Sequence, residues 1–152
     1  MASIVILGVI AGVSLPMIDG ASEAYARATE QRRATEQVAF AMDRCVRLLR
    51  TVPLGSDNAS VGITSVSASA VRFADGRGLE VTGGVLMMRD TSGNTARLCA
   101  DVQTFTLTPL ASDGVTSTTA TPGLTRRFNV TIKTSKTELR GAAFIRVGAM
   151  GI

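Results

Sequence analysis

The chain contains no histidine and no tryptophan, and it has only one tyrosine, two cysteines and two lysines among its 152 residues. The absence of histidine removes the side chain that serves most often as a general base and as a nitrogen ligand of metals. A P-loop, a Gly-x-Ser-x-Gly turn, a zinc-type cysteine spacing and an EF-hand loop are also absent. We therefore expect no enzymatic activity, no metal and no cofactor.

The acidic residues are scattered singly along the chain. Asp75, Asp90 and Asp113 each lie close to a glycine, in a pattern that is typical of turns. A pair of carboxylates held in a pocket, as acid–base catalysis requires, is not indicated by this spacing. The prediction for all three is a structural role in a turn.

Charge is missing from the first 18 residues, because all 16 basic and 12 acidic side chains lie from Asp19 onward. The apolar run before Asp19 is at the short limit for a helix that crosses a bilayer. A cleaved signal peptide is disfavoured because no basic residue stands before this run. Strong helix formers then continue for about thirty residues, until Pro53 and Gly55. The pattern predicts one long helix, with a lipid-type half at 1–18 and an amphipathic half at 19–52.

The second half of this helix has one apolar stripe. Apolar residues recur there every three to four positions, which predicts a face that packs on a core. Two acid-before-base pairs, Glu23 with Arg27 and Asp43 with Arg47, have the spacing of ion pairs on a helix surface. The stripe consists of Val38, Ala41, Met42, Cys45, Leu48, Leu49 and Val52.

Residues 53–152 are rich in small, β-branched and turn residues, which predicts short strands. Alternation is clearest in "RFNVTIKT", where Phe128, Val130 and Ile132 share one face. With no helical period between the strands, we expect an antiparallel meander and an α+β fold. Residues 110–124 form a long polar segment that we expect to be a flexible loop. The expected strands are 62–66, 70–74, 78–82, 85–89, 96–99, 103–108, 127–134 and 137–147.

Two interpretations of the cysteines are open. In the first, Cys45 and Cys99 form a disulfide in an exported domain. In the second, they are two buried thiols that act as small hydrophobic side chains. The second is favoured, because Cys45 lies on a predicted helix and Cys99 on a predicted strand of unknown proximity.

The chain has a net charge of +4 and a pI near 9.8. Such a balance fits either an ordinary arginine-rich surface or contact with nucleic acid. The ordinary surface is favoured, because the basic residues are spread along the sequence and no aromatic residues are interleaved with the paired ones. The candidate basic patch consists of Arg126, Arg127, Lys133 and Lys136.

The segment "MASIVILGVIAGVSLP" resembles the interior of the N-terminal helix of type IV pilins and type II secretion pseudopilins, including the spacing from Gly8 to Pro16. The later segments "VRFADGRGLEV", "GGVLMMRD", "ARLCADVQTFTLT", "RRFNVTIKT" and "AAFIRV" follow the strand order of minor pseudopilins, most closely the J-type subunit. The leader, the first phenylalanine and the glutamate of that family do not stand before this segment. We therefore expect the chain to begin about six residues inside a mature protein, with Met1 an internal methionine.

The resemblance implies a pilin-like fold, with the long helix packed on an antiparallel β-sheet head at 53–152. It also implies a non-enzymatic filament subunit that is inserted in the bacterial inner membrane by a single helix, with its head in the periplasm or outside the cell. The implied partners are other pilin-like subunits, membrane lipid and assembly platform proteins. Small residues in the apolar run allow helices to approach closely. The membrane and assembly segment consists of Ile4, Val5, Ile6, Leu7, Gly8, Val9, Ile10, Ala11, Gly12, Val13, Ser14, Leu15 and Pro16.

Two other functions remain open at this point. The first is a DNA-uptake minor pilin that contacts phosphates through the basic patch. The second is a single-pass membrane-anchored domain that does not polymerise. Phosphate contacts would make binding strongly dependent on salt. Crosslinking in the native membrane would separate a filament subunit from a domain that does not assemble.

Overall fold

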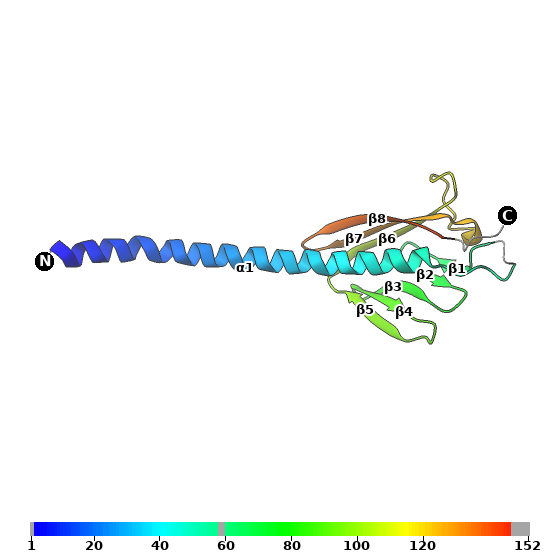
Figure 1. The fold of residues 1–152 in the computed structure, drawn as a ribbon, viewed down its shortest axis with the longest axis horizontal. Coiled ribbons are helices and arrows are strands. Elements are labelled where there is room, and N and C mark those ends of the chain that lie inside the picture. Colours follow the sequence, from blue (N-terminus) through cyan, green and yellow to red (C-terminus); the bar gives the residue numbers. More distant parts are fainter. Residues whose placement is uncertain (1, 58–59, 147–152) are drawn as a thin grey trace. The chain divides into compact units, whose positions relative to one another are not determined.

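The computed structural model describes the backbone of residues 2–57 and 60–146, and the side chains within these ranges from residue 20 onward. The fold is α+β, as expected: a long helix, α1 (Ala2–Arg50), is followed by antiparallel strands (Figure 1). The strands are β1 (Ile63–Val66), β2 (Ala70–Phe73), β3 (Gly78–Thr82), β4 (Val85–Arg89), β5 (Thr95–Cys99), β6 (Val102–Leu110), β7 (Arg127–Thr134) and β8 (Glu138–Phe144). A 3-10 turn, η1 (Pro122–Leu124), lies between β6 and β7.

Contacts within the chain divide it into two units, residues 1–34 and residues 35–152. The first unit is helical throughout its described backbone, including the position of Pro16. The second unit holds the rest of α1 and all the described strands. The helix that the sequence predicts is therefore confirmed, and it ends at Arg50, a few residues before Pro53.

The strands form two sheets instead of one continuous meander. The first sheet has the order β1-β2-β3-β4-β5, and the second has the order β6-β7-β8. The chain leaves the first sheet at Asp101, a non-glycine residue with a positive φ of 58° that aspartate tolerates better than most residues. The backbone N–H of Ser135 also donates to the Asp101 carboxylate, at 3.3 Å. The turn at Asp101 thus lies between β5 of the first sheet and β6 of the second.

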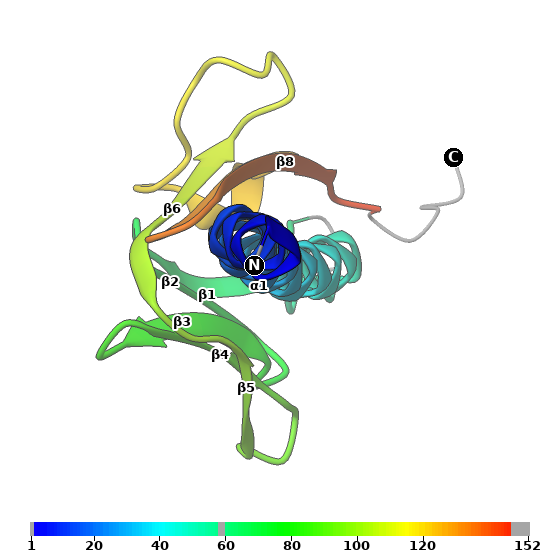
Figure 2. The ribbon, with the colours of Figure 1, turned by 90° about the vertical axis from the view of Figure 1, so that its left-hand side faces the viewer.

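The core of the second unit lies between the C-terminal half of α1 and both sheets. Figure 2 shows the two sheets on different sides of this part of the helix. The predicted apolar stripe from Val38 to Val52 is buried, and so are the alternating residues Phe128, Val130 and Ile132 of β7. Gly141 on β8 lets the helix come close, because a Cβ atom there would be 3.0 Å from the Met42 sulfur. Both periodicities read from the sequence are therefore confirmed.

The polar segment after β6 is a loop, as expected, but it has its own hydrogen bonds. Asp113 accepts from the backbone N–H groups of Val115 and Thr116. The buried hydroxyls of Thr118 and Thr125 lie 2.7 Å apart. The N–H of Val61 donates to the carbonyl of Gly123, which ties the loop to the segment before β1.

The C-terminal end of α1 is held by the turn between β2 and β3. Arg77 donates to the carbonyl oxygen of Thr51 at 2.7 Å and to its hydroxyl at 3.2 Å. Asp75 fixes the guanidinium by an ion pair of 2.6 Å, and Gly76 supplies the positive φ that this turn requires. The cation satisfies a carbonyl that the helix itself leaves open, at the end of the helix dipole that favours positive charge.

Replacement of Arg77 by alanine is expected to lower the free energy of unfolding by about 2 to 3 kcal/mol, because charge-assisted hydrogen bonds to Thr51 are lost in a partly buried site. Urea unfolding followed by circular dichroism measures this change. The control is Arg140→Ala, since Arg140 makes an exposed pair with Glu138 and should cost less than about 1 kcal/mol. Equal losses for the two variants would contradict the proposed role of Arg77.

Candidate functional site

The segment Ile4 to Pro16, predicted to bind membrane and to pack against other subunits, is helical along its backbone. Its side chains lie outside the described residues, so the structure does not test this prediction. Over the part of the chain whose side chains are described, no helix has a stretch long and apolar enough to cross a membrane.

The helix surface of residues 20–34 is mostly exposed. Tyr25 is 77% exposed, and the predicted pair of Glu23 and Arg27 is present with a distance of 3.1 Å. On this surface the aromatic ring of Tyr25 and the ion pair of Glu23 with Arg27 are therefore accessible to a neighbouring molecule. In the second unit, α1 also presents Phe40 and Arg44, with the guanidinium carbon 5.2 Å from the ring centre.

The four residues of the candidate basic patch do not lie together. Arg126 precedes β7 and Arg127 is its first residue, whereas Lys133 is near its end and Lys136 is in the turn that follows. Six residue steps along a strand correspond to about 20 Å. The Nη1 atom of Arg126 is buried, and no described atom forms a hydrogen bond with it.

The outer face of β6–β8 brings together a different set of basic residues. Arg127 and Arg140 line a recess of about 520 Å³, along with Asn129 and Thr131. Arg127 donates to the Asn129 side chain at 3.0 Å, and its guanidinium carbon lies 5.2 Å from the centre of the Phe144 ring. Arg140 could not be found from the sequence, because its position beside Thr131 depends on the register of β7 and β8.

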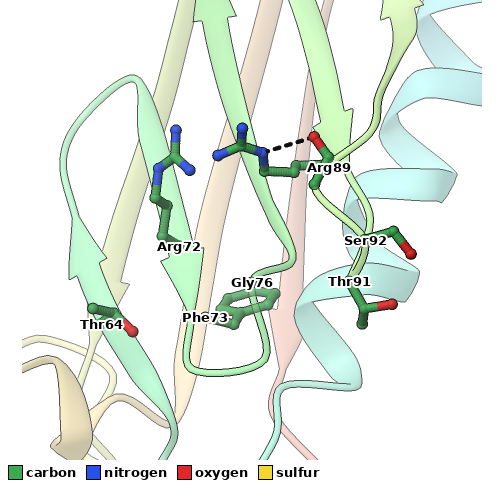
Figure 3. Close-up of a pocket in the computed structure, with 8 residues that line it drawn as sticks. Thr64, Arg72, Phe73, Gly76, Arg89, Thr91 and Ser92 are labelled. Carbon is green, nitrogen blue, oxygen red and sulfur yellow. Dashed lines mark hydrogen bonds between the residues drawn. The ribbon is translucent and has the colours of Figure 1, made fainter.

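The outer face of β2–β4 has a second recess, of about 390 Å³. Figure 3 shows its two arginines, Arg72 and Arg89, on the same side of the sheet, with the guanidinium of Arg89 directed toward Arg72. The hydroxyl residues Thr64, Thr91 and Ser92 also line it. The sequence did not indicate that these two arginines lie close together, because Arg72 is on β2 and Arg89 is on β4, with the whole of β3 between them in the chain.

Cys45 and Cys99 are thiols, and both belong to the one buried core of the second unit. The interpretation of the cysteines as small buried hydrophobic side chains is thus the one that fits the structure. Burial, with a smaller electrostatic effect of Cys99, raises the pKa of Cys45 from 9.0 to about 12. Burial also raises the pKa of Cys99.

Both thiols are expected to resist alkylation by iodoacetamide at pH 8 while the chain is folded. Cys45 is fully buried, and its raised pKa reduces the thiolate fraction by about a thousandfold. Mass spectrometry after a short reaction, with and without urea, measures the difference. Rapid reaction of either cysteine without urea would contradict the burial described here.

The same pKa has a consequence for stability. Since folding raises the pKa of Cys45, the folded state holds this proton more tightly than the unfolded state does. Its contribution to stability is complete below pH 9.0 and is lost as the pH rises toward about 12. Cys45→Ala should remove this part of the pH dependence in chemical unfolding curves.

The three turn aspartates have the structural role that the sequence predicts. The side chain of Asn94 and backbone N–H groups hold the pKa of Asp90 below its usual value, and Thr116 does the same for the pKa of Asp113. Asp75 orients Arg77. No group of three or more His, Cys, Asp and Glu residues that could hold a metal lies within the described residues.

Comparison of the chain with protein-family models gives no match, and comparison with curated proteins gives none either. The pilin-like interpretation therefore depends on the sequence segments and on the α+β architecture described above.

Proposed function

We propose that this protein is a non-enzymatic structural subunit of a pilin-like filament, of the minor pseudopilin or minor pilin type. The apolar N-terminal run, from Ile4 to Pro16, would place the subunit in the bacterial inner membrane and pack against the same run of its neighbours. The head would lie in the periplasm or outside the cell. Assembly platform proteins and other pilin-like subunits are the proposed partners.

The observation that carries this proposal is the continuity of α1 from Ala2 to Arg50. One helix includes the charge-free run and also supplies the apolar stripe around which both sheets of the head pack. In such a subunit the same helix would serve both the membrane and the core of the head. Small residues at Gly8, Ala11 and Gly12 favour close helix packing.

Site-specific crosslinking in the membrane of cells that make the protein tests the proposal. The native cysteines are buried, so a cysteine introduced at Tyr25 provides an accessible thiol on the helix. We expect Tyr25→Cys to form crosslinks with other pilin-like subunits, and Val115→Cys, in an exposed loop, to form far fewer. Crosslinks that are equally rare at both positions would favour a membrane-anchored domain that does not polymerise.

A second candidate function is DNA uptake, and the outer face of β6–β8 is the observation that favours it. Register places Arg127, Lys133 and Arg140 on this face, where Glu138 is the only acidic residue on the three strands. A gel-shift titration at low salt distinguishes this function, because phosphate contacts weaken steeply as salt is added. The absence of a shift at low salt would exclude it.

A further inference from the structure

Strand β3 has a glycine where its two neighbours each have an arginine. Gly78 is paired with Arg72 on β2 and with Arg89 on β4. Residues directly opposite in antiparallel strands project to the same face of the sheet. The two arginines are therefore two strand spacings apart, about 10 Å between Cα atoms, and no side chain stands between them.

The gap at Gly78 is enforced by the backbone. A Cβ atom at this position would lie only 2.3 Å from the carbonyl oxygen of Val71, and a backbone atom cannot yield as the end of a flexible side chain can. The space between the two arginines is thus a fixed feature of the sheet. Arg72 and Arg89 have side chains long enough for both guanidinium groups to reach one ligand across it.

The polar side chains that line this recess all carry hydrogen-bond donors. Arg72 and Arg89 supply guanidinium groups, and Thr64, Thr91 and Ser92 supply hydroxyls. None of the lining residues is acidic. Thr64 is available because the β1–β2 register shifts between Ile63 and Ser65, which leaves it without a partner residue on β2.

The nearby carboxylates already have other hydrogen-bond partners. Glu80 is paired with Arg72 at 2.9 Å. Asp90 accepts from the N–H groups of Ser92 and Asn94 and from the Asn94 side chain. Arg89 donates its Nε atom to the carbonyl of Gly93 at 3.2 Å, and no ion pair of Arg89 occurs within the described residues. Among the described residues, Arg89 is therefore the guanidinium group of the recess that forms no ion pair with a carboxylate.

We propose that this recess binds a carboxylate of an acidic peptide segment on a partner protein. A guanidinium group presents two parallel N–H donors that match the two oxygens of a carboxylate, and Arg72 already binds Glu80 in this sheet. The protein nature of the partner rests on the proposed function, in which the head lies beside other subunits. The site itself rests on Arg72 and Arg89, which line the recess, and on the lack of a side chain at the buried Gly78 between them.

The test is a titration of the full chain, labelled with ¹⁵N and kept in a nonionic detergent. The ligand is a short capped peptide of alternating Glu and Gly, and the matched ligand has Gln in place of Glu. We expect the Glu peptide to shift the amide resonances of Gly76 and Gly93, and the Gln peptide to have no effect. Arg89→Gln should weaken binding at least about tenfold. Arg97→Gln removes the same charge from β5 and should change affinity less than about twofold.

A second measurement uses the unmodified chain. Phenylglyoxal reacts with arginine side chains, and the Glu peptide should protect Arg72 and Arg89 from it but not Arg97. Equal weakening by Arg89→Gln and Arg97→Gln, or equal binding of the Gln peptide, would overturn the proposal.

Inorganic phosphate serves as a competing probe. Shifts caused by phosphate but not by the Glu peptide would show a different ligand and would also overturn the proposal. Because the titration uses chains that are not assembled, a negative result leaves the crosslinking of Tyr25→Cys as an independent test of the filament.

Discussion

A lysine at Ile10 is expected to abolish assembly while the head remains folded. Ile10 lies in the middle of the charge-free run, and a charged residue at the centre of a membrane helix costs about 2.5 to 3.5 kcal/mol. The described core begins at Val38, and Ile10 belongs to the other unit of the chain, so the head is expected to fold in the lysine variant. Crosslinks of a Tyr25→Cys, Ile10→Lys double variant should fall at least about tenfold.

Ile10→Leu is the control for this experiment, since it keeps the apolar character and the size of the side chain. Its crosslinks should equal those of Tyr25→Cys alone. Circular dichroism of the purified variants establishes that the head is folded in each case. A lysine variant that remains in the membrane fraction and still forms crosslinks would contradict the proposed role of the run.

Phe128→Ala is expected to produce the largest loss of stability in the head, about 3 to 5 kcal/mol. Phe128 is fully buried on the central strand β7, where it is paired with Pro109 and Ala143. Truncation to alanine leaves a cavity between the second sheet and the helix that the surrounding side chains fill only in part. Urea unfolding measures the change in free energy.

Phe144 is the matched control on the neighbouring strand. Phe144 is 61% exposed, and its ring contacts the guanidinium group of Arg127. Phe144→Ala should therefore cost about 1 kcal/mol or less. A loss at Phe144 as large as that at Phe128 would mean that the core described here does not determine the stability of the head.

The features that were predicted from the sequence are those in which apolar or charged residues recur every two to four positions. The stripe of α1 and the alternation of "RFNVTIKT" depend on residues two to four positions apart, so each can be read locally. All eight expected strands are present, and their bounds differ from the expected ones by a few residues at most. The ion pairs of Glu23 with Arg27 and of Asp43 with Arg47 follow from the same local geometry.

The features that were missed depend on register or on long separations. The contact of Arg77 with Thr51 joins residues 26 positions apart. Arg72 and Arg89 come together only because Gly78 is opposite both of them. The turn between the two sheets includes Asp101, whose positive φ has no signature in the sequence pattern. The candidate basic patch was chosen by nearness in sequence, and the length of β7 separates Arg127 from Lys133.

The core around α1 also has a consequence for synthesis of the chain on the ribosome. The apolar stripe that ends at Val52 emerges early, but residues that cover it include Gly141 and Ala143 on the last described strand. Neither sheet alone surrounds the stripe, so a nascent chain exposes part of it until β8 has been made. The newly made helix is therefore a natural substrate for a chaperone or for the translocation machinery during this interval.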